Sequence, residues 1–563
     1  MTNFNLNLTH RDMIKILLCG STYLFADSRY HQINKIKYMK LIISILLIAS
    51  SFVLNAQSER TTYKKLERSL KLIDSQYADT VDAAKITTAA VKAMIAELDP
   101  HSKYLSPKDL KKNNEQLNGS FAGIGVHYQI LNDTLLVLNT VKGGPADLAK
   151  VKAGDRLLEI DGKASVGGIV TNSYLSKNLR GKRGTTVSLK LLSHNNKVKN
   201  VNIKRNSIAI HTLASSYMID RKTAYIRISS FSRTTNSEVQ IALMQLSMMG
   251  MKNIIVDLRD NPGGLMVASI NLADDFLSAD KLIVYTKGAH SPRTEYKSKP
   301  GGQMEKGKLV VLIDENSASA AEIFAGAIQD WDRGIIMGRR SFGKGLVGRN
   351  YNLPDGSAIR LTTGRYHTPS GRCIQKSFKA NKGEYNKDIL ERYERGELYS
   401  ADSIHFNDSL RYYTNSKRIV YGGGAIMPDI FVPIDTSFYS DYLKQLNRYG
   451  IINLFAGMYF DNNLESLLKK YSTIDKFDKH FEMSDKEFDE LNILAFNKNK
   501  IKGSDSDITT SKKYIEAKFK AYLARDLYQE GYYKVYNKLD KLVLKAIEII
   551  NSDKAFIENK IQH

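Results

Sequence analysis

The sequence predicts a multidomain α+β protein, and three observations support this fold class. The chain has 563 residues, more than a single domain usually holds. Hydrophobic residues make up 42% of it, with ordinary amounts of glycine and proline, which indicates folded domains. The hydrophobic pattern changes along the chain, from helical spacing to short alternating strands, then to buried strands followed by helices, and finally back to helices.

An export signal is predicted near the start of the chain. Met39 precedes an apolar run at residues 41–53, which ends shortly before Ala56. This is the layout of a secretory signal peptide, and the run is short for a membrane span. We therefore expect residues 1–56 to be a leader cleaved after Ala56, translation to start at Met39 so that residues 1–38 are not made, and the protein to be exported to the periplasm or cell envelope. An uncleaved membrane anchor is the alternative.

Composition narrows the classes of partner and cofactor. Only two cysteines occur, Cys19 and Cys373, and the first lies in the leader, so the mature chain cannot form an internal disulfide. The formal net charge is +23, but the lysines form no stripe interleaved with aromatic residues and no groove-reading motif appears. We expect no nucleic-acid partner, although peripheral association with anionic membranes stays open. No histidine or cysteine cluster has ligand spacing, so we expect no metal and no other cofactor.

The changes in pattern divide the chain into parts. Apolar residues recur at helical spacing between Tyr63 and Leu98, and again between Tyr514 and Leu527. The C-terminal helices are expected to pack on the preceding domain or to mediate assembly. After the leader we therefore expect four parts: an N-terminal helical region at 57–117, a small β-rich domain at 118–206, an α/β domain at 207–435 and a C-terminal helical extension at 436–563.

The β-rich domain begins with a glycine-containing loop before a predicted strand. Glycines at such a loop let backbone amides converge on the terminal carboxylate of a peptide, while the following strand pairs with the peptide. A small β-domain that binds nothing is the alternative. Further glycine-containing turns at 143–146, 153–155 and 160–162 strengthen the resemblance to a PDZ domain. The candidate residues for binding a substrate's C-terminal tail are Gly123, Ile124, Gly125 and Val126.

The α/β domain contains two strongly apolar runs, at residues 253–258 and 309–313. Each is followed by glycine or small residues and a helical pattern, which predicts a mostly parallel sheet with its active site at the strand ends. The first run leads to two adjacent glycines, where another backbone or a ligand can approach closely. The candidate oxyanion-hole amides are those of Gly263, Gly264 and Ala320. Glycines that only turn the chain are the alternative.

A serine and a lysine near the second run indicate nucleophilic chemistry. Residues 317–322 (Ser-Ala-Ser-Ala-Ala-Glu) place a serine on a tight strand-to-helix turn, where helix amides point at whatever the hydroxyl attacks. Lys344 follows on a glycine-flanked segment, where partial burial can remove its proton and allow it to act as a base. From the residues alone, helix-capping serines and a solvated lysine remain the alternative.

At these residues the chain resembles the carboxyl-terminal processing proteases, which are tail-specific serine peptidases with a PDZ domain and a Ser-Lys dyad. In that family the nucleophile precedes the lysine by the interval that separates Ser319 from Lys344, which implies Ser319 as nucleophile and Lys344 as base. Glu322 and Asp330 match acidic positions of the family motif and are implied as supporting residues. The resemblance runs from about residue 60 to 435 and implies a ClpP/crotonase-like protease core.

The resemblance implies an exported serine endopeptidase that captures C-terminal tails through its PDZ domain and cleaves them at Ser319. The expected partners are protein C-termini, an adaptor lipoprotein that presents them, and further copies of the chain in an oligomer. One position departs from the family, because Gly348 stands where a glutamine commonly orients the dyad. A catalytically impaired PDZ scaffold that binds tails without cutting is therefore the alternative. His101, in an Asp-Pro-His segment, is interpreted as a capping or packing residue outside the site.

Overall fold

The computed structural model describes residues 61, 63–378 and 382–561, so the predicted leader lies outside the described residues. The chain divides into two compact units, Met1–Met94 and Ile95–His563. In the first unit, residues 63–76 are helical and α3 (Ala83–Ala96) begins. None of the described helices combines the length and the apolar character that a membrane crossing requires.

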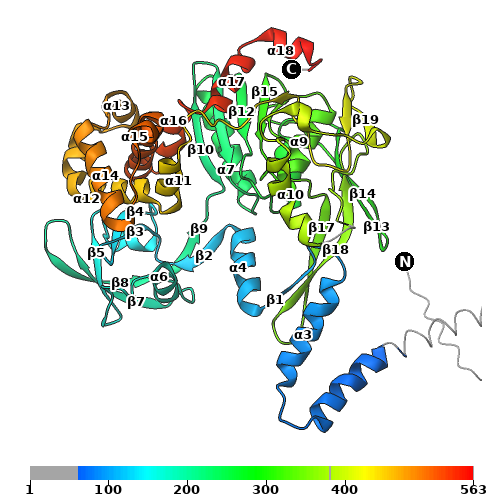
Figure 1. The fold of residues 1–563 in the computed structure, drawn as a ribbon, viewed down its shortest axis with the longest axis horizontal. Coiled ribbons are helices and arrows are strands. Elements are labelled where there is room, and N and C mark those ends of the chain that lie inside the picture. The colour runs from blue at the N-terminus through cyan, green and yellow to red at the C-terminus, as the bar shows by residue number, and fades with distance from the viewer. Residues whose placement is uncertain (1–60, 62, 379–381, 562–563) are drawn as a thin grey trace, which may run out of the picture. The chain divides into compact units, whose positions relative to one another are not determined.

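The second unit contains a six-stranded sheet at its centre (Figure 1). Five of its strands run parallel, and only β10 is antiparallel to its neighbour. The predicted mostly parallel sheet is therefore confirmed. In spatial order its strands are β10 (Leu213–Met218), β11 (Thr223–Ile228), β12 (Asn253–Asp257), β15 (Leu309–Ile313), β16 (Ile335–Gly338) and β21 (Ile430–Phe431).

Both faces of this sheet are apolar and covered. Along β12, Ile254 and Val256 face one cluster of buried side chains and Ile255 faces the other. Such continuous apolar strands are typical of parallel sheets with helices on both sides. The helices α7 (Thr235–Met248), α8 (Met266–Asp274) and α9 (Ala320–Asp330) supply the first cluster, and α17 (Lys541–Ile550) and α18 (Asp553–Glu558) supply the second.

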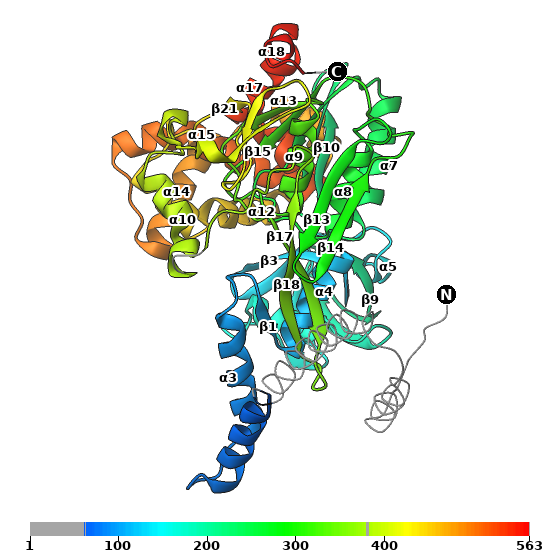
Figure 2. The same cartoon turned by 90° about the vertical axis from the view of Figure 1, so that its right-hand side faces the viewer.

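A second, antiparallel sheet lies beside the parallel one (Figure 2). Its main feature is a hairpin that turns at Gly356, where φ is +80°. The predicted N-terminal helical region contributes a strand as well as helices, because residues 103–105 pair with this hairpin. The strands are β1 (Lys103–Leu105), β13 (Leu282–Gly288), β14 (Ser291–Lys297), β17 (Leu346–Asn352) and β18 (Ala358–His367).

The predicted PDZ domain folds as a β-sheet around its own apolar core. The order of its main strands is β3-β4-β5-β7-β8, so β3 is an end strand with one edge unpaired within the sheet. Two further strands, β2 and β9, pair where the chain enters and leaves the domain. The elements are β2 (Ser120–Gly123), β3 (Val126–Leu131), β4 (Thr134–Thr140), α5 (Pro145–Leu148), β5 (Arg156–Ile160), β6 (Lys163–Ala164), α6 (Asn172–Leu179), β7 (Thr186–Leu192), β8 (Val198–Lys204) and β9 (Asn206–Ala209).

The C-terminal extension is helical and contacts both preceding domains (Figure 1). Its aromatic-rich core includes Leu131, Leu136 and Leu138 from the outer face of the PDZ sheet. Arg156 of the PDZ domain also forms an ion pair with Asp461. The helices of this core are α11 (Asp441–Arg448), α12 (Ile451–Lys470), α13 (Ile474–His480), α14 (Asp485–Asn499), α15 (Asp505–Tyr528) and α16 (Gly531–Tyr536).

The remaining described elements connect these parts. Helix α4 precedes the PDZ domain, and α10 follows the antiparallel sheet. Their bounds, with those of a short hairpin, are α4 (Pro107–Asn118), α10 (Lys382–Glu394), β19 (Arg411–Tyr413) and β20 (Ile419–Tyr421).

Candidate active site

Ser319 lies at the start of α9, directly after the loop that leaves β15. Its backbone has φ +56° and ψ −111°, a region that residues other than glycine rarely adopt. Such a conformation costs on the order of 1–3 kcal/mol and persists only where surrounding contacts enforce it. Ser319 remains partly exposed. The other serine of the motif, Ser317, is fully buried, and its hydroxyl donates to the Leu258 carbonyl at 2.8 Å.

The buried carboxylate of Glu322 joins the serine segment to the lysine segment. It accepts the backbone N–H of Ser319 at 2.8 Å, of Gly343 at 2.7 Å and of Lys344 at 2.9 Å. It also accepts the Ser341 hydroxyl at 2.6 Å. Burial raises the pKa of the Glu322 carboxyl, and these four donors oppose that rise. One side chain therefore fixes the backbones of both candidate catalytic residues.

Tyr366, on β18, forms a second connection between the same two residues. Its side chain is buried, and its hydroxyl lies 3.0 Å from the Ser319 carbonyl oxygen and 2.7 Å from the Lys344 carbonyl oxygen. Burial, and then the nearby Glu322 carboxylate, raises the pKa of Tyr366 well above its usual value, so the phenol stays protonated and can donate. The sequence analysis did not identify Tyr366, because it belongs to a strand with no local catalytic motif.

Lys344 occupies an electropositive environment. Burial lowers the pKa of its ammonium group, the positive charges of Arg360 and Lys103 lower it further, and Glu322 opposes them. Both causes favour the neutral amine that a general base requires. Within the described residues no hydrogen bond joins Ser319 Oγ to Lys344 Nζ. Catalytic hydrogen bonds are often long before substrate binds, so this geometry is compatible with a dyad.

The side chain of Arg360 lies beside Gly348. A Cβ at Gly348 would make ordinary contact, at 3.4 Å, with Cγ and Cδ of Arg360, whose charge adds to burial in lowering the pKa of Lys344. A glutamine from another segment, Gln375, is buried beside the lysine segment. Its Oε1 accepts the Gly345 N–H at 2.9 Å, so it holds the backbone next to Lys344.

The predicted oxyanion-hole set needs one correction. The Gly263 N–H donates to Asn261 Oδ1 at 2.9 Å, so the prediction of Gly263 as a free donor is wrong. Gly263 instead provides space, because a Cβ there would lie 2.7 Å from the Ser319 Cβ. The amides of Gly264 and Ala320 have no acceptor among the described residues, and both remain candidates. Gly264 has φ +147°, and a Cβ there would lie 1.9 Å from the Phe231 carbonyl oxygen.

Asp330 and His101, both named from the sequence, make contacts outside the Ser319–Lys344 pair. Asp330 lies at the far end of α9 from Ser319 and accepts from Arg372 at 2.7 Å, so it supports a neighbouring segment and not the reacting atoms. His101 Nε2 lies 2.6 Å from the Tyr385 hydroxyl. Burial, and then the charge of Lys344, lowers the pKa of His101 to about 4, so this imidazole is neutral beside the site. The described residues include no cluster of three potential metal ligands.

The candidate tail-binding loop has the features that a peptide carboxylate requires. The amides of Ile124 and Gly125 donate to no group in the described chain. Beside them, β3 offers its unpaired edge. A cavity of about 10 Å³ behind the loop is lined by apolar side chains, including Val126 and Leu179. This volume admits about one water molecule, so a ligand side chain would have to open it.

Comparisons with known protein families match three segments of the chain. Residues 222–381 match the profile "Peptidase family S41", residues 122–204 match "PDZ domain", and residues 442–529 match a family of unknown function. A "Probable CtpA-like serine protease" of Staphylococcus aureus (strain COL) is 31% identical over 342 residues, covering 59% of this chain and 68% of the relative.

A comparison with solved structures matches a photosystem II D1 C-terminal processing protease. It is 27% identical, with 55% of this chain and 89% of that chain covered and a TM-score of 0.32. The PDZ domain of a carboxy-terminal protease from Vibrio cholerae, in complex with peptide, is 29% identical, with 16% of this chain and 97% of that chain covered and a TM-score of 0.15.

The parallel sheet, the site at its strand ends and the profile matches define a serine peptidase that carries a PDZ domain. The predicted enzyme class is thereby confirmed. The chain belongs to peptidase family S41, among the relatives of the CtpA-like serine proteases.

Replacing Tyr366 with Phe tests the connection between the two segments. The variant removes a hydroxyl that reaches both carbonyls, so we expect the protein to lose about 1–3 kcal/mol of stability and kcat to fall by about tenfold as the two residues move apart. Urea unfolding and steady-state kinetics measure both effects. Tyr351→Phe, on the exposed part of the neighbouring strand, is the control. Unchanged kcat in Tyr366→Phe would show that this hydroxyl does not position the site.

Proposed function

We propose that this protein is an exported endopeptidase that binds the C-terminal tails of protein substrates through its PDZ domain and cleaves them with a Ser319–Lys344 dyad. The observation that supports this most is the Glu322 carboxylate, which holds the backbones of both residues at 2.8 and 2.9 Å. A buried carboxylate destabilises the folded state unless hydrogen-bond donors surround it. Moving Ser319 and Lys344 apart would remove such donors from Glu322 and is therefore unfavourable.

In this mechanism the neutral amine of Lys344 takes the proton of Ser319 Oγ as the oxygen attacks the scissile carbonyl carbon. The resulting oxyanion accepts hydrogen bonds from the amides of Gly264 and Ala320, at the positive end of α9. The C–N bond then breaks, and the leaving amine takes the proton from the Lys344 ammonium. Lys344 next deprotonates a water molecule, which hydrolyses the acyl-enzyme and restores Ser319.

The proposed tail recognition rests on the loop and strand of the PDZ domain. The amides of Ile124 and Gly125, which have no acceptor in the described part of the chain, suit a terminal carboxylate, and the edge of β3 that is unpaired within its sheet suits an extended peptide. Proposed export to the periplasm or cell envelope rests on the signal-like pattern after Met39. We also propose that an adaptor lipoprotein presents substrates to the enzyme and that the chain associates with further copies of itself.

A catalytically impaired scaffold is the second candidate function. The observation that favours it is Gly348, which leaves Lys344 without the glutamine that commonly orients the dyad. Gln375 holds the neighbouring Gly345 backbone, but no hydrogen bond from it to the Lys344 amine occurs in the described structure. Hydrolysis of an unfolded protein with an apolar C-terminus separates the two functions.

Ser319→Ala is expected to abolish this hydrolysis while tail binding remains, because only the nucleophilic oxygen is removed. Lys344→Arg should also inactivate, since a guanidinium stays protonated and cannot act as a base. Ser317→Ala is the matched control: it loses a buried hydrogen bond, with about 1–3 kcal/mol of stability, but keeps measurable kcat below its melting temperature. An inactive Ser317→Ala with an active Ser319→Ala would reverse the assignment.

The pH profile tests the electrostatics of Lys344. The lysine must be neutral to act as a base, so kcat/KM should rise with pH through its lowered pKa. Arg360→Gln removes a nearby positive charge, which raises the pKa of Lys344 and moves the rising limb to higher pH. Arg349→Gln, at an exposed position on the adjacent strand, should leave the limb in place. A limb that does not move in Arg360→Gln argues against Lys344 as the titrating base.

Amidation of a substrate's C-terminus tests tail recognition. The amide cannot supply the anion that the Ile124 and Gly125 amides stabilise, so kcat/KM should fall by about tenfold or more, mainly through KM. The same substrate with a free carboxylate is the control. Equal cleavage of both forms would rule out tail recognition without affecting the assignment of Ser319.

A further inference from the structure

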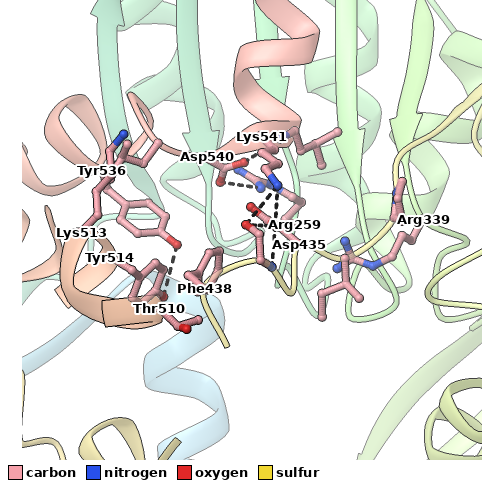
Figure 3. A pocket seen from close by; sticks show the side chains of 15 residues that line it. Arg259, Arg339, Asp435, Phe438, Thr510, Lys513, Tyr514, Tyr536, Asp540 and Lys541 are labelled. Atoms are coloured by element: carbon pink, nitrogen blue, oxygen red, sulfur yellow. Dashed lines mark hydrogen bonds and ion pairs between the residues drawn. The ribbon is translucent and has the colours of Figure 1, made fainter. Parts of the chain in front are cut away.

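The C-terminal extension reaches the loop that carries the candidate oxyanion hole. Arg259, the first residue of that loop, donates from Nη1 to the Asp540 carboxylate at 2.8 Å (Figure 3). Asp540 is the N-cap of α17, and its other oxygen accepts the amides of Leu542 and Val543. Both side chains of the ion pair are about one-eighth exposed, at 12% and 13%. The pair lines a pocket of about 410 Å³ and ties helix α17 to the loop.

Arg259 also holds the end of β12. Its Nη2 donates to the fully buried carboxylate of Asp257 at 2.6 Å, and Arg227 donates to the same carboxylate at 2.7 Å. Burial alone would raise the pKa of Asp257, but the two guanidinium groups outweigh it and keep the carboxyl ionised. Arg227 additionally lies over the ring of Tyr533, on α16, at 4.7 Å. The C-terminal helices therefore contact both arginines of this buried cluster.

The loop at residues 259–264 contacts the nucleophile segment directly. Residues 259–264 end at Gly263 and Gly264, and Gly263 packs against Ser319 so closely that no Cβ would fit. Asn261 accepts the Ala318 N–H through its carbonyl oxygen at 2.9 Å. The Gly263 carbonyl also accepts the Phe231 N–H at 2.9 Å, so the loop is held at both ends, by Arg259 at one and by this bond at the other.

A second contact joins this loop to the one before Ser319. The Asp260 N–H donates to Asp314 at 3.0 Å, and Asn316 Nδ2 donates to Asp260 at 3.0 Å. Asp260 has φ +58°, in the left-handed region that aspartate adopts more readily than most residues with a side chain. Arg227 adds a contact from outside the loop by donating to Asp260 at 3.0 Å.

We propose that Asp540 is a positioning residue for catalysis: by holding Arg259, it fixes the 259–264 loop so that the Gly264 amide faces the oxyanion formed at Ser319. This inference rests on the proposed function, because it takes Ser319 and the Gly264 amide as parts of the catalytic site. It assigns to the C-terminal extension, whose residues 442–529 match a family of unknown function, a role in the chemical step.

The variant Asp540→Asn separates positioning from folding. Asparagine caps a helix as well as aspartate does, so α17 keeps its N-cap while the charge that holds Arg259 is lost. We expect kcat to fall by about tenfold with KM changed less than about twofold. A peptide aldehyde, whose hemiacetal oxygen uses the same amides, should bind more weakly by the same factor as kcat falls. A C-terminal tail peptide should bind with unchanged affinity.

Two further variants keep the test decisive. Lys541→Ala removes the neighbouring ion pair between Lys541 and Asp435 but leaves the ion pair between Asp540 and Arg259 in place (Figure 3). This variant should retain wild-type kcat. Arg259→Lys keeps a cation beside Asp257 but lacks the planar fork whose separate nitrogens reach Asp257 and Asp540, and it should lose kcat as Asp540→Asn does. Adding Asp540→Asn to Arg259→Lys should then cost little more.

The outcomes distinguish this inference from the proposed function. Wild-type kcat in Asp540→Asn, with Ser319→Ala inactive, overturns the positioning role alone. Equal kcat losses in Asp540→Asn and Lys541→Ala, or a loss of kcat in Asp540→Asn that a fall in melting temperature accounts for, overturn it as well, because the effect is then structural. Activity in Ser319→Ala overturns the proposed function itself.

Discussion

The Glu322 carboxylate is the interaction on which the rest of the site depends. It is fully buried and accepts four hydrogen bonds, three of them from backbone amides of segments that are distant in the sequence. Burying this carboxylate without hydrogen-bond donors would strongly destabilise the fold, and leaving the amides without an acceptor would destabilise it as well. The strained backbone of Ser319 can persist because this side chain and the Tyr366 hydroxyl hold both sides of it. The nearby positive charges then lower the pKa of Lys344, whose backbone Glu322 holds in place.

The parallel sheet explains why these groups meet at one edge. The strands β12, β15 and β16 end together, so the loops after them carry the Gly264 amide, Ser319 and Lys344 respectively. Helices on both faces keep the strands dry, and the C-terminal extension provides one of those faces. The candidate reacting groups therefore lie between Gly264 and Lys344, while Tyr366, whose hydroxyl reaches the carbonyls of Ser319 and Lys344, comes from a later strand.

Much of the fold and part of the site could be predicted from the sequence, because those features are local. The apolar runs and their following turns predicted the parallel sheet, and the interval between Ser319 and Lys344 supported the dyad. Tyr366 and Gln375 were not predicted because they reach the site through tertiary contacts without a pattern of their own. Gly263 was assigned wrongly as a donor because the acceptor of its amide, the side chain of Asn261, cannot be identified from a glycine pair. Asp540 was not predicted either, because its contact with Arg259 joins residues that are far apart in the sequence.

The packing of the PDZ sheet on the C-terminal helices has a consequence for how such proteins can evolve. Leu131, Leu136 and Leu138 lie on strands of the PDZ sheet, but they are buried in the core of the C-terminal helices. A PDZ domain taken out of this chain would present an apolar face to water, and one introduced from another protein would lack the matching face. Recombination can therefore exchange the two parts only as a pair, so the tail-binding domain and the extension should be inherited together.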